Sequence, residues 1–362
     1  MGRRLQLHER FGGRDGWRPH GKPVTIEDDR RLESWLGAEI GIRSARLGPA
    51  IKGGNSNVTR VVETDHGKLV LRHPPRETVS DRAAAGIKRE FAALRALHGA
   101  APVPEPVAFC EDPAILGQPF SVGRFVEGVA ITDRLPADYS SVEGANAIGR
   151  AMLRAVGAAH KVDPDGRVPD WFGRQSGFVE RQIDRWVQVR ANSRVRDLPL
   201  LEEIAGWLRS NEPAALPVRI VHCDFHLDNC LSFSMRPGIA AIIDWEMATL
   251  ADPRIDPALA LFFWKREPSR RLGFPSIQAF SNRPDVVDRR VLEAEWSEAS
   301  GLDPAGMGYF IVFAAWRLAA IVEGAYFLYR EGKVDSEYAR NLETDVPALL
   351  EEAADMISRG AN

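Results

Sequence analysis

The spacing of apolar residues divides the first third of the chain into two predicted helices and several short strands. Residues 25 to 41 repeat apolar side chains every fourth position and end in a glycine, which is typical of a helix. Residues 80 to 100 show the same periodicity. Two β-rich runs within residues 58 to 72 flank an Asp-His-Gly turn, which predicts a hairpin, and residues 102 to 128 add two more strand-like runs. This order predicts an α+β lobe over residues 25 to 124.

Helical periodicity dominates the remainder of the chain. Only two β-like runs interrupt it, RIVHCDF and IAAIIDW. The most apolar segment, residues 308 to 329, contains Arg317 and Glu323. Charges at this depth are costly in a bilayer, so we expect a buried core helix rather than a membrane span. We therefore assign residues 125 to 362 to a larger, mostly helical lobe and residues 1 to 24 to an N-terminal arm.

Composition and charge agree with a globular protein of two lobes or two domains. The chain has 362 residues, of which 44% are hydrophobic and 27% are charged. Lys and Arg number 47 against 50 Asp and Glu, so no basic excess suggests a nucleic-acid partner. The three cysteines lack zinc-type spacing, and the basic N-terminus has no apolar core of a signal peptide. We expect a cytoplasmic protein without a membrane partner, and the sequence leaves its oligomeric state open.

Polar residues gather between the two β-like runs, in the stretch VHCDFHLDNC. His222 and His226 are four residues apart, but their flanks look extended rather than helical, and no downstream cluster of His or Cys accompanies them. A zinc site is therefore disfavoured. The neighbouring carboxylates and amide suit Mg²⁺ better, because hard cations prefer oxygen ligands.

The same stretch matches the requirements of phosphoryl transfer. This chemistry needs a carboxylate near the attacking hydroxyl, oxygen ligands for Mg²⁺ and a cation at the nucleotide phosphates. The His-x-Asp-x4-Asn frame makes Asp224 the predicted base, and Asn229 and Asp244 the predicted metal ligands. Upstream, Arg72 ends a strand-like run and Glu90 lies on the following helix, where it can orient that cation.

A glycine-rich turn precedes these residues. Backbone amides in such a turn can cover phosphates, because glycine permits close approach of the main chain. An ordinary hairpin turn is the competing interpretation. The residues predicted to cover the phosphates are Gly53, Gly54, Asn55 and Ser56.

These motifs together resemble the aminoglycoside phosphotransferase (APH/choline kinase-like) family, and within it the branch of kinase-like domains fused to acyl-CoA dehydrogenases. The resemblance implies a two-lobed protein-kinase-like fold, with a small β-rich N-lobe and a larger helical C-lobe, and transfer of phosphate from ATP to a small-molecule hydroxyl. It covers residues 45 to 330. Two departures are Cys223, where the family usually has glycine, and Arg72, where most kinases have lysine. The motifs are IKGGNSNVTRVV, LVLRHPP, KREFAALRAL, VHCDFHLDNCL, AAIIDWEMATLADPRIDPA and WRLAAIVEG.

The resemblance also implies roles for residues that spacing alone does not assign. The adenine is expected beside the main chain of the lobe connection, at Val122, Gly123, Arg124 and Phe125. His222 is expected to brace the catalytic loop, residues 222 to 229. Asp252 and Asp256 are expected to secure the metal strand, which is the β-like run that contains the predicted metal ligand Asp244.

The acceptor site is the least defined part of the sequence. His226 is a candidate to approach the substrate, with a structural imidazole as the alternative. Arg317 and Glu323 either form a structural ion pair or face the cleft. Because the late helix is mainly apolar, we expect a partly apolar hydroxylated metabolite, such as a hydroxyacyl compound or an aromatic alcohol. An antibiotic kinase, an ATP-binding pseudokinase and a metallohydrolase on His222, Asp224 and His226 are the alternatives.

Overall fold

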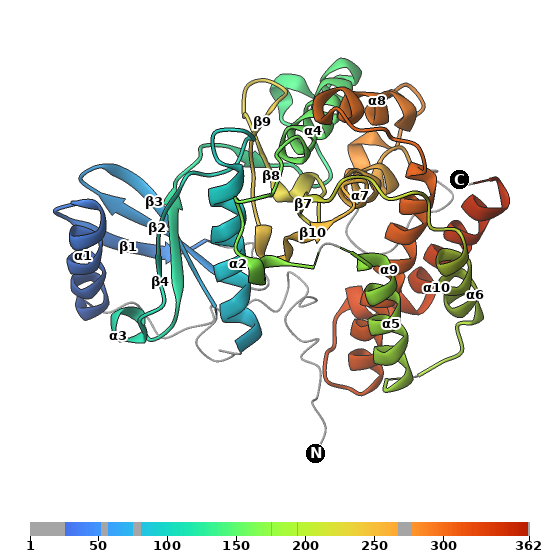
Figure 1. Cartoon of the computed structure of the whole chain (residues 1–362), viewed down its shortest axis with the longest axis horizontal. Coiled ribbons are helices and arrows are strands. Elements are labelled where there is room, and N and C mark those ends of the chain that lie inside the picture. Colours follow the sequence, from blue (N-terminus) through green and yellow to red (C-terminus); the bar gives the residue numbers. More distant parts are fainter. Residues whose placement is uncertain are drawn as a thin grey trace.

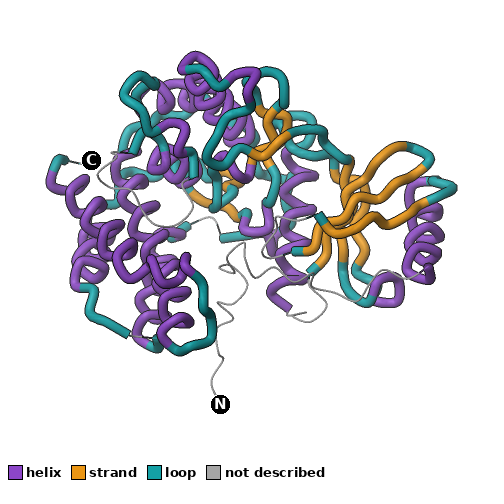
Figure 2. The backbone as a smooth tube through the Cα atoms, turned by 180° about the vertical axis from the view of Figure 1, so that it is seen from behind, coloured by secondary structure: helices purple, strands orange, loops and turns teal. Residues whose placement is uncertain are grey.

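The computed structural model describes residues 26–51, 57–74, 81–174, 176–193, 195–266 and 277–360. It forms two lobes, one built around a sheet and one mostly helical (Figure 1). Seen from behind, the long strands gather at one end and most helices at the other (Figure 2). The predicted α+β class with two lobes is therefore confirmed. The residue at which one lobe gives way to the other stays a prediction.

The N-lobe contains a five-stranded antiparallel sheet with the order β1-β2-β3-β5-β4. The β-rich runs form the predicted hairpin, in which Thr59 pairs with Arg72. Leu69 and Leu71 of the third strand pack with Leu32 and Leu36 of α1 in a separate core, while α2 lies on the side of the sheet toward the C-lobe (Figure 1). The elements are α1 (Ile26–Ile40), β1 (Ala45–Ala50), β2 (Val58–Thr64), β3 (Gly67–His73), α2 (Asp81–Leu97), β4 (Pro106–Cys110), α3 (Pro113–Leu116) and β5 (Phe120–Arg124).

Helices form most of the C-lobe, and two small antiparallel sheets display its loops. One sheet pairs β7 with β10, and the other has the order β6-β8-β9. The helices are α4 (Val142–His160), α5 (Phe178–Ala191), α6 (Pro199–Ser210), α7 (Ile255–Phe263), α8 (Arg289–Ser300), α9 (Met307–Arg330) and α10 (Glu337–Ser358). The strands are β6 (Val129–Ala130), β7 (Arg219–Val221), β8 (Cys230–Ser232), β9 (Ile239–Ile242) and β10 (Thr249–Ala251). The 3-10 turns are η3 (Ala137–Tyr139), η4 (Asp170–Phe172), η5 (Leu227–Asn229), η6 (Trp245–Met247) and η8 (Ala279–Ser281).

The apolar helix α9 is the centre of the C-lobe core. Among the described residues it is the helix long and apolar enough to cross a membrane, yet 83% of that apolar window is buried inside the protein. It packs against α5, α6, α7 and α10. Its apolar character therefore has a structural explanation, as expected for a buried core helix.

Candidate active site

Two neighbouring strands bring the predicted metal ligands to the same end of a small sheet. Cys230 of β8 pairs with Ile242 of β9, so the residues just outside this pair also lie opposite each other. The backbone N–H of Ile243 donates to the carbonyl of Asn229 at 2.9 Å. Asp244 follows directly. The register therefore brings Asn229 opposite Ile243, the residue before Asp244, and the role of both residues as metal ligands stays a prediction.

Hydrogen bonds within the loop set the orientation of its side chains. The Nδ2 group of Asn229 donates to the carbonyl of Asp224 at 2.7 Å, so the Oδ1 atom is the one suited to a cation. The Nδ1 atom of His222 accepts from the N–H of Asp224 at 3.3 Å, and its Nε2 group donates to the carbonyl of Ile243 at 2.8 Å. His222 thus braces the loop with both ring nitrogens and has none left for a metal. Within the described residues, no group of three or more His, Cys, Asp or Glu side chains could hold a metal.

Two residues of the site have left-handed backbone, one directly after His222 and one directly after Ile243. Cys223 has φ 68° and Asp244 has φ 67°, a region that disfavours residues other than glycine. The conformation explains why the family usually has glycine at the first of these positions. Burial raises the pKa of Cys223 to about 12, against the opposing charge of Arg317. This thiol is therefore a protonated, packed side chain rather than a nucleophile.

A buried carboxylate holds the strained start of the catalytic loop. Asp256, at the start of α7, accepts the N–H groups of His222 at 2.6 Å and Cys223 at 2.8 Å. His160 Nε2 contacts the same carboxylate at 3.1 Å, and its Nδ1 atom accepts from Trp296 at 2.9 Å. Asp256 therefore secures the catalytic loop rather than the metal strand, which corrects the expectation from sequence. The reason is that α7 begins beneath the loop.

Its sequence neighbour Asp252 has a different set of partners. Its Oδ2 atom accepts from Arg254 at 2.7 Å and from the N–H of Leu216 at 3.1 Å. These bonds fasten the start of α7 to the segment that precedes β7. Asp252 is therefore a structural residue of the C-lobe core.

The two charged residues of α9 have separate partners. Arg317 Nη1 donates to the carbonyl of Cys223 at 2.7 Å. Glu323 accepts from Arg196, with Nε to Oε1 at 3.1 Å and Nη2 to Oε2 at 2.5 Å. Six residues along a helix correspond to a rotation of about 240°, so the two side chains point to different faces. Glu323 is a structural ion-pair partner, Arg317 holds the catalytic loop, and contact of either with an acceptor stays a prediction.

His226 lies close to the predicted metal ligand. Its Nε2 atom is 3.5 Å from Asn229 Nδ2, and its ring meets Phe263 edge to face with 6.0 Å between centroids. Asp228 Oδ1 is 3.9 Å from the Nδ1 atom of the same imidazole. This position agrees with either a substrate-facing or a structural imidazole, and both interpretations stay open.

The N-lobe contributes a cation that bridges the lobes. Arg72 donates to Glu90 of α2 through Nη1 and to Asp244 Oδ1 through Nη2 at 2.8 Å. Burial alone would lower the pKa of Arg72. The carboxylates of Glu90 and Asp244 outweigh this effect, so the pKa of the guanidinium is raised. Burial raises the pKa of Glu90, as do Asp244 and Glu246, and Arg72 opposes this. The structure therefore joins three of the predicted site residues.

The donor set fits a magnesium ion. Asn229 and Asp244 offer oxygen atoms next to the start of β8 and the end of β9, which pair with each other. The guanidinium of Arg72 already contacts one oxygen of Asp244. Asp244 keeps 35% of its side chain exposed, so its carboxylate is accessible from solvent. The predicted phosphate-covering residues lie outside the described part of the chain: Gly53, Gly54, Asn55 and Ser56.

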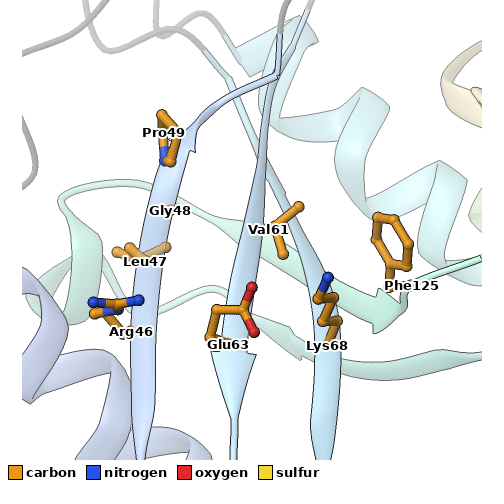
Figure 3. Close-up of a pocket in the computed structure, with 8 residues that line it drawn as sticks. All are labelled: Arg46, Leu47, Gly48, Pro49, Val61, Glu63, Lys68 and Phe125. Atoms are coloured by element: carbon orange, nitrogen blue, oxygen red, sulfur yellow. The ribbon is translucent and has the colours of Figure 1, made fainter.

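A pocket of about 490 Å³ lies on one face of the N-lobe sheet, where Lys68 is among its lining residues (Figure 3). Lys68 and Arg72 are four residues apart in β3, so they share a face, and a strand rises about 3.3 Å per residue between them. The Phe125 ring lines one side of the pocket, with Lys68 Nζ 5.7 Å from its centroid (Figure 3). The lining residues are Arg46, Leu47, Gly48, Pro49, Val61, Glu63, Lys68 and Phe125.

The main chain near this pocket is less available than the sequence suggests. β5 is an inner strand between β3 and β4, so its backbone groups pair on both sides. The N–H of Arg124 donates to Glu105 at 2.9 Å, and the N–H of Phe125 donates to Lys68 at 3.2 Å. These two N–H groups therefore already have acceptors within the N-lobe, and use of the remaining main-chain groups of Arg124 and Phe125 by adenine stays a prediction. Other contacts of Val122 and Gly123 with a base stay a prediction.

Comparisons with known proteins show which family the chain resembles. The model of the phosphotransferase enzyme family (APH) matches residues 48–290. Acyl-CoA dehydrogenase family member 10 from Mus musculus is 29% identical over 354 residues, which cover 94% of this chain and 32% of the relative. The chain thus spans about a third of the length of that curated relative.

Solved structures show the same fold. A Ralstonia eutropha protein, described as a candidate aminoglycoside phosphotransferase, has a TM-score of 0.75 and 25% identity, covering 90% of this chain and 98% of that one. Aminoglycoside 2'-phosphotransferase-IIIa, solved as its GDP complex, has a TM-score of 0.57 at 15% identity, with 90% and 98% covered. The second likeness concerns the fold alone. From the family model and the assembled motifs, we conclude that the chain belongs to the phosphotransferase enzyme family.

Proposed function

We propose that this phosphotransferase moves the γ-phosphate of ATP to a hydroxyl group of a small molecule, with Mg²⁺ as cofactor. The observation that carries the proposal is the bridge from Arg72 to Asp244, which joins the N-lobe to the end of β9 beside Asn229. A cation, an oxygen-ligand pair and a catalytic-loop carboxylate are the parts that phosphoryl transfer requires. Their convergence from distant segments supports this chemistry better than any single motif.

In the proposed reaction, Asp224 accepts or orients the proton of the acceptor hydroxyl. The hydroxyl oxygen forms a bond to the γ-phosphorus, the bond from that phosphorus to the bridging oxygen breaks, and ADP leaves with the electron pair. Arg72 can turn its planar fork from Asp244 to the phosphate oxygens while Glu90 orients it. The Oδ1 atom of Asn229 and the carboxylate of Asp244 would hold Mg²⁺, which neutralises phosphate charge when bound.

The proposed acceptor is a hydroxylated and partly apolar molecule, such as a hydroxyacyl compound or an aromatic alcohol. An aminoglycoside is a polycation and calls for several carboxylates, yet the acidic residue of α9, Glu323, is already paired with Arg196. The mouse relative is named an acyl-CoA dehydrogenase family member, which supports an acyl-type acceptor. An aminoglycoside is the second candidate, favoured by the titles of the solved structures with this fold.

Mass spectrometry tests the reaction type. The protein is incubated with Mg-ATP and a pool of hydroxylated metabolites, and we expect one compound to gain the mass of a phosphoryl group. Nucleotide binding without any such product would instead support a pseudokinase. Hydrolysis that depends on zinc would support the metallohydrolase alternative.

A steady-state panel tests the acceptor class. Hydroxyacyl compounds, aromatic alcohols and kanamycin-like aminoglycosides are compared at equal Mg-ATP, and we expect higher kcat/KM for the apolar classes. Efficient phosphorylation of several aminoglycosides, with no turnover of the others, would contradict this choice of acceptor and leave the reaction type intact.

A further inference from the structure

A second hydrogen bond joins the lobes beside the Arg72 bridge. Asn57 Nδ2 donates to Glu246 Oε2 at 2.5 Å, although 189 positions separate the two residues in the chain. Asn57 is 6% exposed and immediately precedes β2. An asparagine that only shaped its own turn would bond to nearby backbone. The distant carboxylate partner indicates a tertiary role for Asn57.

The two bridges connect the same parts of each lobe. β2 pairs with β3 so that Val58 faces His73 and Thr59 faces Arg72, which places Asn57 and Arg72 at one end of the hairpin. Glu246 follows Asp244 by two residues and lies within η6, which Asp244 precedes. One end of the N-lobe hairpin therefore holds one turn of the C-lobe at two points.

The packing around Glu246 leaves this turn little room to move. A Cβ atom at Gly86 of α2 would lie 3.7 Å from the Cβ of Glu246, so the helix approaches the turn closely. Trp245, between the two bridged carboxylates, is fully buried, and its indole N–H donates to the carbonyl of Ile242 at 3.0 Å. The close approach of α2 and the buried indole therefore support the shape of this turn, and the bond from Asn57 ties the turn to the hairpin.

We infer that Asn57 and Glu246 form an interlobe clamp. This clamp sets the distance between the proposed metal-binding turn, residues 244 to 247, and the nucleotide face of the N-lobe, which is the sheet face that carries Lys68 and Arg72. They are positioning residues, and the inference rests on the proposed function. A hydrogen bond to a carboxylate is stronger than one between neutral groups. The clamp favours the arrangement that Mg-ATP needs, so its loss weakens Mg-ATP binding through the population of that arrangement.

The clamp predicts a difference between two ligands. Mg-ATP contacts both the metal-binding turn and the N-lobe, whereas adenosine occupies only the base end of the site. Loss of the clamp should therefore raise the Kd of Mg-ATP on the order of tenfold and leave the Kd of adenosine unchanged. General damage to the N-lobe would weaken both ligands.

A donor–acceptor exchange tests the pair directly. Asn57→Asp places two carboxylates face to face and should raise the Kd of Mg-ATP. Adding Glu246→Gln to that variant restores a hydrogen bond with donor and acceptor exchanged and returns the original net charge. We expect calorimetry on the full chain to find the Kd of the double variant within about threefold of wild type, since one hydrogen bond of similar geometry is regained.

Controls separate the clamp from other causes. Asn211→Asp adds the same carboxylate at the exposed end of α6, and it should leave the Kd of Mg-ATP unchanged. A double variant that binds Mg-ATP as poorly as Asn57→Asp would overturn the clamp while the proposed function stands. A wild-type protein that fails to bind Mg-ATP would overturn the proposed function and the clamp together.

Discussion

The two sides of the active site are held in different ways. On the C-lobe side, buried side chains hold the backbone of the catalytic loop. Asp256 accepts from the N–H groups of His222 and Cys223, and Arg317 donates to the carbonyl of Cys223. On the N-lobe side, Arg72 and Asn57 donate to the partly buried side-chain carboxylates of Asp244 and Glu246. The comparison indicates that the C-lobe holds its loop through backbone contacts, which we call the fixed frame, whereas the N-lobe is joined to it through side-chain contacts alone at these two points.

A further contact extends the fixed frame. Gln278 is fully buried, and its Oε1 atom accepts from the N–H of Leu227 at 3.2 Å. Its Nε2 group donates to the carbonyl of Ala260 at 3.0 Å. This residue links α7 to the part of the loop between the predicted base and Asn229. Both ends of the catalytic loop are therefore attached to the C-lobe core.

Removal of the carboxylate under the loop should have the largest effect on stability. Asp256→Ala leaves two buried N–H groups and the imidazole of His160 without their acceptor. We expect the free energy of unfolding to fall by about 3–5 kcal/mol, measured by urea denaturation. Asp303→Ala removes an exposed turn bond and serves as the control, with a loss below about 1 kcal/mol. Equal losses in both variants would contradict the idea of a fixed frame.

Changes to the bridging arginine should act mainly on the nucleotide. Arg72→Ala removes the planar cation, so we expect the KM for ATP to rise by roughly 10- to 100-fold, the range of one charge-assisted hydrogen bond. Arg72→Lys should recover only part of this loss, because an ammonium group is a point charge. Steady-state kinetics at varied ATP measures both. An unchanged KM in both variants would place Arg72 outside the nucleotide site.

The corresponding change on the C-lobe side should affect the rate instead. Arg317→Met keeps the volume of the buried stem but loses the bond to the carbonyl of Cys223. We expect kcat to fall roughly tenfold, by the loss of one charge-assisted bond, with little change in the KM for ATP. Steady-state kinetics at saturating acceptor separates the two parameters. A raised KM for ATP with unchanged kcat would remove the contrast between the two sides.

Substitution of two buried cysteines by glycine should reveal the strain in the loop. Cys223 has φ 68°, whereas Cys230 has φ −120°, and both are buried. Glycine relieves the left-handed conformation only at the first position, by roughly 1–2 kcal/mol. Thermal unfolding should therefore find Cys223→Gly more stable than Cys230→Gly by about that amount. Equal losses would show that residue 223 carries no backbone strain.

Local patterns made the elements and the chemical motif predictable from the sequence. The turn of the β2–β3 hairpin and the His-x-Asp-x4-Asn frame each occupy a few consecutive residues. The bond from Asn57 to Glu246 was not predictable, because nothing in either segment specifies the other. The register of β5 was equally hidden: the sequence indicated a strand there, but its inner place in the sheet, which consumes the N–H of Arg124, depends on distant pairing.

The two charged residues in the middle of α9 show the same limit of sequence analysis. Arg317 and Glu323 look equivalent as charges in an apolar helix. Their different roles follow from what lies opposite each helix face, which is the catalytic loop for one and Arg196 for the other. Helical spacing places them on separate faces, but only the fold supplies their partners.

The most direct test of the account compares binding and chemistry in Asp224→Asn. The substitution keeps the shape of the side chain and removes the proton acceptor, while Arg72, Asn229 and Asp244 remain in place. We expect the Kd of Mg-ATP to match wild type and the single-turnover rate of phosphoryl transfer to fall by about 10²- to 10⁴-fold. Transfer at the wild-type rate in this variant would contradict the assignment of the base and, with it, the central claim about the catalytic loop.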